Sequence, residues 1–210
     1  MARPTPLLIA ALAASLALGA AQAHSQHAQH ELQQAAAAKP STVKVRYDDT
    51  ALVDADGRTL RVKSDVIGER LVVIDFVYTT CTTVCPVLSA MMAQVQNEVG
   101  AKAGSDDVRL VTITVDPARD TPARLKEYGA RFGAGPNWLW LTGPTGRVNE
   151  VLKGFGAYTA NYEDHPPLVL VGDPKSGQWT RFFGLTDPKL VAARVQELRA
   201  ARAMPAGHKH

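Results

Sequence analysis

The stretch "RLVVIDFVYTTCTTVCPVLSAMMAQVQNEVG", residues 70–100, combines three local patterns that together favour an α/β fold. Residues 70–78 form a nearly continuous apolar and β-branched run, which is typical of a strand buried on both faces. Residues 85–100 carry apolar side chains at helical spacing and end at a glycine, which predicts a helix. The chain's two cysteines, Cys81 and Cys85, lie between these elements. The stretch therefore predicts a buried strand, a cysteine loop and a helix in direct succession.

The alternation of strands and helices continues on both sides of this stretch. Residues 42–49 and 57–64 alternate apolar and polar side chains around a turn signal, which predicts an N-terminal β-hairpin or two short edge strands. The downstream pattern predicts strands at 107–115 and 137–143, helices at 120–133, 146–156 and 187–203, and a hairpin at 167–184. Such an order is typical of an α/β domain with a mixed sheet flanked by helices.

Composition divides the chain of 210 residues into four segments. Residues 1–23 have one basic residue, an apolar run and a small-residue end, the layout of a cleavable signal peptide. The run is shorter than the roughly 18 residues that a membrane span needs, which favours a cleaved signal over the alternative, an uncleaved anchor. Residues 24–40 predict a flexible histidine-containing arm, residues 41–203 one domain and residues 204–210 a disordered tail.

Charge and location narrow the classes of partner. Removing residues 1–23 lowers the formal charge from +3 to +2, which is too small for an electrostatic case for nucleic acid. A signal peptide predicts a periplasmic or exported protein, soluble after cleavage. In such an oxidising compartment a cysteine pair is either a staple or chemically active.

Three interpretations of Cys81 and Cys85 are open: a stabilising disulfide, a redox pair or a metal site. A spacing of four at the start of a helix brings the two side chains to the same side. Pro86 suits the first turn of a helix, so Cys85 is expected near a helix N-terminus, where a thiolate is stabilised. Closing so short a loop removes little unfolded-state entropy, which favours the redox and metal interpretations over the staple.

A third ligand is suggested by counting histidines. His165 is the one histidine of the predicted domain, and it precedes the hairpin at 167–184. If that hairpin neighbours the strand at 70–78, the histidine segment and the cysteine loop meet at one edge of the sheet. Two thiolates and an imidazole suit Cu(I) and can also hold Cu(II), whereas zinc prefers a fourth ligand. The terminal histidines His24, His27, His30, His208 and His210 could gather copper weakly, although tails without function are the simpler interpretation.

Three segments in this order resemble the Sco/SenC family of copper-binding, thioredoxin-like proteins, which help assemble the copper centre of cytochrome c oxidase. They are "CTTVCP" after a buried strand, "VTITVDPARDTPARLKEY", and "EDHPP" before the last hairpin, and the resemblance covers about residues 45–200. It implies a thioredoxin-like fold and copper ligation by Cys81, Cys85 and His165. The sequence departs from the family where residues 82–84 lack an acidic residue and where Pro166 replaces a small hydroxyl residue.

The resemblance implies an exported copper metallochaperone that delivers copper to the CuA centre of cytochrome c oxidase. The alternative is a periplasmic thiol-disulfide oxidoreductase that keeps the acceptor's cysteines reduced. The expected partners are the oxidase subunit carrying CuA, a thiol reductant and other periplasmic copper chaperones. A peroxiredoxin ranks third, because its cysteine pattern is incomplete: Thr82 stands three before Cys85, but Tyr78 takes the proline position.

Several residues near the motifs have structural and functional interpretations. Asp164 could accept a hydrogen bond from His165, or be a solvated loop carboxylate. By resemblance to thioredoxins, Pro167 could follow a cis peptide bond. Structural roles suffice for the remaining candidates, namely Asp116 and Asp120 at a turn and helix start, Met91 and Met92 in a helix, and Trp138 and Trp140 on one face of a strand.

Overall fold

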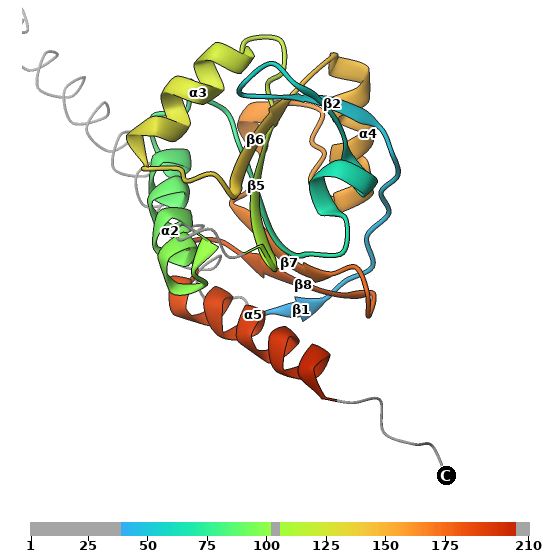
Figure 1. The fold of residues 1–210 in the computed structure, drawn as a ribbon. Coiled ribbons are helices and arrows are strands. Elements are labelled where there is room, and N and C mark those ends of the chain that lie inside the picture. Colours follow the sequence, from blue (N-terminus) through green and yellow to red (C-terminus); the bar gives the residue numbers. More distant parts are fainter. Residues whose placement is uncertain (1–38, 102–105, 205–210) are drawn as a thin grey trace, which may run out of the picture. The chain divides into compact units, whose positions relative to one another are not determined.

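An eight-stranded mixed sheet runs through the computed structural model, which describes residues 39–101 and 106–204 (Figure 1). Its strands follow the order β1-β8-β7-β4-β5-β6-β2-β3. β4, β5 and β6 are parallel neighbours, and every other neighbouring pair is antiparallel. The strands are β1 (Ser41–Thr42), β2 (Ala51–Asp54), β3 (Thr59–Arg61), β4 (Leu71–Val77), β5 (Val108–Thr114), β6 (Trp138–Thr142), β7 (Leu168–Asp173) and β8 (Gln178–Phe183). The predicted mixed sheet flanked by helices is confirmed.

Helices cover both faces of this sheet. They are α2 (Val84–Glu98), α3 (Pro122–Arg131), α4 (Thr145–Phe155) and α5 (Pro188–Ala203). Thr121 caps α3 by accepting a hydrogen bond from the N–H of Arg124 at 3.3 Å, and Asp187 caps α5 in the same way. Each cap is followed by a proline at the first helical position, so the local sequence sets where these helices begin.

The central strand β4 is buried along its whole length and separates two hydrophobic clusters. Leu71, Val73 and Val77 pack under α2, α3 and α5, whereas Val72, Ile74 and Phe76 pack under α4. Successive side chains of a strand point to opposite faces, so one apolar run serves both clusters. Figure 1 shows α2 and α5 on one side of the sheet and α4 on the other.

The tryptophan and methionine expectations for the core are confirmed. Trp138 and Trp140 lie in the cluster under α2, α3 and α5, with ring centroids 5.1 Å apart. Met91 and Met92 are buried in the same cluster. They fill core space on the face of the sheet that also holds the cysteines.

The N-terminal hairpin is present, but it is shorter and lies later in the chain than residues 42–64 predicted. β2 and β3 form it around Asp56 and Gly57, and β2 also pairs with β6. Residues 43–50 contain no strand, because their backbone groups bond to other elements: the N–H of Val43 donates to Trp179 O and that of Arg46 to Gly154 O. After β3 the chain forms a π-helix, η1 (Val62–Ile67), instead of continuing as a strand.

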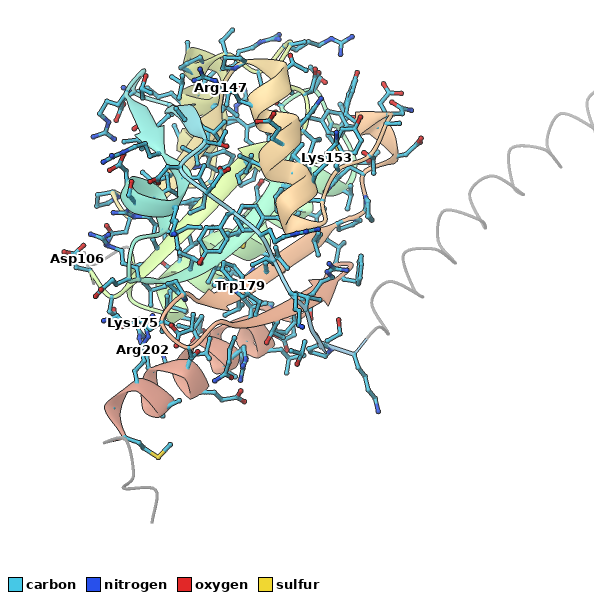
Figure 2. All side chains as sticks on the ribbon, turned by 90° about the vertical axis from the view of Figure 1, so that its right-hand side faces the viewer. Asp106, Arg147, Lys153, Lys175, Trp179 and Arg202 are labelled. Carbon is cyan, nitrogen blue, oxygen red and sulfur yellow. The ribbon has the colours of Figure 1, made fainter. Side chains whose placement is uncertain are left out.

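Aromatic packing holds residues 43–50 against the face that α4 covers. The Tyr47 ring stacks on Phe155 of α4 at 5.8 Å and meets Trp179 of β8 edge-on at 5.6 Å. Figure 2 looks onto this face and shows Trp179 on the strand below α4. Because of these tertiary contacts, the strand that the alternating pattern of residues 42–49 predicts does not form beyond Thr42.

Several expectations fall outside the described residues. They are the signal peptide at 1–23, nearly all of the arm at 24–40, the terminal histidines, and the tail beyond Met204. Within residues 39–101 and 106–204, no helix combines the length and apolar character that a membrane crossing requires.

Candidate functional site

The two cysteines lie where β4 gives way to α2. β4 ends at Val77, and the backbone N–H of Cys81 donates to the carbonyl of Tyr78 at 3.2 Å, which closes a turn. Cys81 remains in the loop, and Cys85 lies in the first turn of α2, which begins at Val84. Both thiols are free and buried, and they border the cluster under α2, α3 and α5. The predicted order of strand, cysteine loop and helix is confirmed.

A hydrogen bond within this loop makes Cys81 the more acidic thiol. The backbone N–H of Cys85 donates to the Sγ of Cys81 at 3.3 Å, and the hydroxyl of Thr83 lies 3.8 Å from the same sulfur. Burial by itself would raise the pKa of Cys81, but the hydrogen bonds from Cys85 and Thr83 outweigh it and lower the pKa to about 7. Cys81 is therefore the thiol that is substantially ionised near neutral pH.

Cys85 behaves in the opposite way, which corrects the expectation that the helix N-terminus stabilises its thiolate. Burial raises the pKa of Cys85, and the neighbouring Cys81 sulfur and the carboxyl group of Asp75 raise it further. The expectation is wrong because the helix N–H at this position points to the other sulfur, while the side chain of Cys85 lies in the core. The N–H at the start of the helix thus stabilises the thiolate of Cys81, which precedes the helix.

Sequence reasoning missed Asp75, a buried carboxyl group on the cysteine side of β4. Its Oδ1 accepts a hydrogen bond from Thr112 on β5, and its Oδ2 has no partner among the described residues. Burial is the largest influence and raises the pKa of Asp75 to about 7. A signal was available, because Asp75 is the one charged residue in the apolar run of residues 71–77. Buried carboxyl groups need a structural or chemical reason to be kept in a core.

His165 approaches the site from the neighbouring strand, as the sequence suggested. β7 pairs antiparallel with β4, with Val169 opposite Asp75, so the chain entering β7 runs beside the end of β4 where the cysteine loop begins. His165 is buried, and its ring packs 5.9 Å from that of Phe76. Its Nε2 has no hydrogen-bond partner among the described residues, and burial lowers the pKa of His165 to about 4. The imidazole is neutral at physiological pH.

The three predicted ligands do not form a ready cluster. Within the described residues, no three His, Cys, Asp or Glu side chains lie close enough together to hold a metal ion. Cys81 and Cys85 meet in the cluster under α2, whereas the ring of His165 contacts Phe76, which belongs to the cluster on the other face of the sheet. Ligation by all three side chains stays a prediction.

The functional interpretations of two residues near His165 do not agree with the structure. Asp164 is exposed, and none of the hydrogen bonds in the described part of the chain joins its carboxylate to the imidazole, so it is a solvated loop residue. The peptide bond before Pro167 is trans, like every other bond in the described residues, and the cis-proline expectation is wrong. Pro167 instead accepts a hydrogen bond from the N–H of Gly184, which lies just beyond β8.

Asp120 has a larger structural role than a helix start. It is fully buried and accepts hydrogen bonds from the N–H and hydroxyl of Thr79, at 3.1 Å and 2.5 Å, and from the hydroxyl of Thr114. Asp120 thereby ties the beginning of the cysteine loop to the end of β5. The backbone N–H of Asp120 also bonds to the carbonyl of Asp116, which closes the turn that the sequence predicted.

This chain is similar to known proteins in both sequence and fold. A sequence model described as SCO1/SenC matches residues 37–200. The SCO1 protein homolog of Bacillus subtilis is 37% identical over 117 residues, which cover 54% of this chain and 58% of that protein. The chain spans about half the length of the first curated relatives that it matches.

Two solved structures share the fold at higher coverage. The structure of Bradyrhizobium japonicum ScoI with copper bound is 29% identical, has a TM-score of 0.59, and is matched over 74% of this chain and 99% of that one. The structure of BsSco, whose description names a disulfide switch and the Sco family of cytochrome c oxidase assembly proteins, is 26% identical with a TM-score of 0.63. That match covers 77% of this chain and 96% of the other.

Proposed function

Because the chain belongs to the SCO1/SenC family, we propose that it is an exported copper metallochaperone that delivers copper to the CuA centre of cytochrome c oxidase. The copper-bound structure of Bradyrhizobium japonicum ScoI supports copper as the cargo. The description of BsSco as a member of a family of cytochrome c oxidase assembly proteins supports the oxidase as the destination. The proposal assigns Cys81, Cys85 and His165 as the copper ligands.

The observation that carries this proposal is the pair of free thiols joined by the hydrogen bond from Cys85 N–H to Cys81 Sγ. Metal binding requires deprotonated sulfurs, and the pKa of Cys81, lowered to about 7, makes the first deprotonation accessible at neutral pH. Two thiolates are soft ligands of the kind that Cu(I) prefers.

The donor set also fits Cu(II) once His165 is added. The Nε2 of His165 is buried and has no hydrogen-bond partner in the described part of the chain, and the imidazole is neutral, so it can donate a lone pair without first losing a proton. The segment between α4 and β7, residues 156–167, is the histidine loop. The proposal requires this loop to bring His165 to the cysteines, because the described residues hold no preformed three-residue cluster. Three protein ligands leave a coordination position for an incoming ligand of the acceptor, which is the route for copper transfer.

A second candidate function is a periplasmic thiol-disulfide oxidoreductase. The contrast between the two thiols favours it, because a low pKa at Cys81 and a raised pKa at Cys85 suit an attacking and a resolving cysteine. The Cys81 thiolate would attack a target disulfide, form a mixed disulfide and release one thiol. Cys85 would then attack Cys81, release the second thiol and leave a Cys81–Cys85 disulfide, which an external thiol reductant must reopen.

Copper titration of the reduced protein tests the ligand assignment. We expect one Cu(I) per chain, a large loss of affinity in Cys85→Ser, and little change in His165→Ala, because two thiolates alone can hold Cu(I). His165→Ala is expected to weaken Cu(II) binding and alter its absorption spectrum. An unchanged Cu(II) affinity and spectrum in His165→Ala would remove His165 from the ligand set.

A disulfide-reduction assay without copper separates the two functions. An oxidoreductase turns over a disulfide substrate in the presence of a thiol reductant, and Cys81→Ser abolishes that turnover. A chaperone alone binds copper stoichiometrically and shows no such turnover. Both measurements on the same preparation therefore rank the two functions.

The proposal also names partners and a location. The partners are the oxidase subunit that carries the CuA site, a thiol reductant that keeps Cys81 and Cys85 open, and other periplasmic copper chaperones. The signal-like segment at residues 1–23 supports export to the periplasm, with anchoring by an uncleaved N-terminal helix as the alternative. Cell fractionation, together with N-terminal sequencing of the mature chain, distinguishes these locations.

A further inference from the structure

Arg119 lies in the turn between β5 and α3 and reaches the histidine loop across 43 residues of sequence. Its Nη1 donates to the Oδ2 of Asp116 at 2.9 Å and to the hydroxyl of Tyr162 at 2.6 Å. The guanidinium carbon also lies 5.4 Å from the centroid of the Tyr162 ring, within the range of a cation–π contact. The Asp116 side chain is only 4% exposed, so a buried carboxylate holds the guanidinium in place.

Tyr162 connects this arginine to both halves of the proposed copper site. It begins the short helix η3 (Tyr162–Asp164), and its carbonyl accepts a hydrogen bond from the N–H of His165 at 3.2 Å. Its ring meets that of Tyr78 edge-on, with centroids 5.1 Å apart. Tyr78 in turn precedes the cysteine loop and accepts the N–H of Cys81 through its carbonyl. Tyr162 is thus a direct link between the His165 segment and the start of the cysteine loop.

The histidine loop depends on such external contacts for its position. A three-residue 3-10 helix has few hydrogen bonds of its own, so its conformation is set largely by what it packs against. Among residues 39–101 and 106–204, the other side-chain hydrogen bond of the Tyr162 hydroxyl goes to the exposed Glu163 at 3.4 Å, within the same loop. Arg119 is therefore the contact that ties this hydroxyl to a separate and buried part of the domain.

We propose that Arg119 is a positioning residue for the histidine loop: by holding Tyr162 against Tyr78, it keeps the His165 segment beside the start of the cysteine loop. This inference rests on the proposed function where it concerns copper, but the position of the loop can be tested without metal. Loss of the Arg119 contact releases the loop. More conformational entropy is then lost when His165 joins the cysteines on copper. This loss weakens the binding of Cu(II), which needs the imidazole, and leaves the binding of Cu(I) unchanged.

Amide hydrogen exchange of the reduced, copper-free protein tests the position of the loop. The N–H groups of Asp164 and His165 are hydrogen bonded within the loop, and we expect their exchange to accelerate about tenfold in Arg119→Ala and in Tyr162→Phe. Tyr162→Phe keeps the ring and leaves the Arg119–Asp116 ion pair intact, so it serves if Arg119→Ala fails to fold. Arg119→Lys is expected to restore most of the protection, because its ammonium can donate to both oxygens.

Arg131→Ala is the matched control, because it removes an arginine of similar exposure that pairs with Glu127 on the same helix. It is expected to leave exchange at Asp164 and His165 unchanged. The double variant Arg119→Ala/Tyr162→Phe is expected to exchange no faster than Arg119→Ala, because Arg119→Ala by itself already removes the hydrogen bond to the Tyr162 hydroxyl.

Copper titration of the same variants supplies the second measurement. We expect Cu(II) affinity about tenfold weaker in Arg119→Ala and Tyr162→Phe, with a shifted Cu(II) absorption band, and unchanged Cu(I) affinity. Exchange at His165 within twofold of the wild type in both variants would overturn the positioning role. Faster exchange with unaltered Cu(II) binding would overturn its link to copper. Failure of the ligand assignment would show separately as wild-type Cu(II) binding by His165→Ala, and the exchange data would still decide the role of Arg119.

Discussion

The backbone N–H of Cys85 donates a hydrogen bond to the Sγ of Cys81 at 3.3 Å, so one cysteine of the pair stabilises the thiolate of the other. The two sulfurs are close in sequence but differ in environment. Both side chains are buried, but Cys81 lies in the loop and receives this bond, whereas Cys85 lies in the first turn of α2. The pair is therefore chemically asymmetric.

Thiol alkylation should report this asymmetry. We expect the rate of Cys81 modification by iodoacetamide to be half-maximal near pH 7, because the pKa of Cys81 is lowered to about 7 by hydrogen bonds that outweigh its burial. Cys85 should stay unreactive until much higher pH, because burial raises its pKa. Mass spectrometry across a pH series measures both rates. Cys85→Ser should retain the reactive thiol and Cys81→Ser should lose it, and two thiols with equal pH profiles would contradict the asymmetry.

Asp75 should make the protein less stable as pH rises. Its carboxyl group has a pKa raised from 3.8 to about 7, so between these values the unfolded chain releases a proton that the folded protein keeps. The unfolded state then binds fewer protons, and the free energy of unfolding falls as pH increases from about 4 to about 7. Above this range the penalty is constant, and below it the penalty is absent.

Asp75→Asn removes this titration while keeping an oxygen that can accept the hydrogen bond from Thr112. We expect the variant to exceed the wild type in free energy of unfolding by roughly 2–4 kcal/mol at pH 8, and by much less at pH 4. Chemical denaturation at both pH values measures the difference. A stability difference that is the same at both values would mean that Asp75 does not titrate as proposed.

Asp120 should hold the start of the cysteine loop. Asp120→Ala leaves the N–H of Thr79 and the hydroxyl of Thr114 without their carboxylate partner in a buried place, which we expect to lower the free energy of unfolding by about 2–4 kcal/mol. Asp56→Ala removes an exposed carboxylate that pairs with Lys126, and it should lower the free energy of unfolding much less than Asp120→Ala does. Urea denaturation measures both losses of free energy of unfolding. Equal losses in the two variants would show that Asp120 does not hold the start of the cysteine loop.

Gly154 in α4 should not tolerate a side chain, although the same helix accepts one at Gly146. A Cβ at Gly154 would overlap the carbonyl oxygen of Arg46, whereas nothing lies within 4 Å of a Cβ at Gly146. We expect Gly154→Ala to lower Tm by roughly 4–8 °C, and Gly146→Ala to be neutral or to stabilise by up to about 1 kcal/mol. Calorimetry of both variants tests whether residues 43–50 pack on α4 as described.

Local patterns were sufficient for most of the fold. The apolar run at residues 70–78, the helical spacing after Cys85, and the caps at Thr121 and Asp187 each depend on neighbours in sequence, and each element forms close to its predicted place. Residues 43–49 do not form the predicted strand, because Tyr47 packs on Phe155 and Trp179 and the segment does not pair with a neighbouring strand. Such distant contacts carry no signal within the segment itself.

By itself, the sequence determined the candidate ligands and the family: two cysteines before a helix, a histidine before the strand that pairs beside them, and motifs of the SCO1/SenC family. Only the tertiary structure decided which sulfur is acidic, because this depends on the burial of Cys85 and on the hydrogen bonds that Cys85 and Thr83 make to the Cys81 sulfur. It also revealed the contact between Arg119 and Tyr162. Proton affinity and loop position are set by burial and by long-range hydrogen bonds, which a linear pattern does not encode.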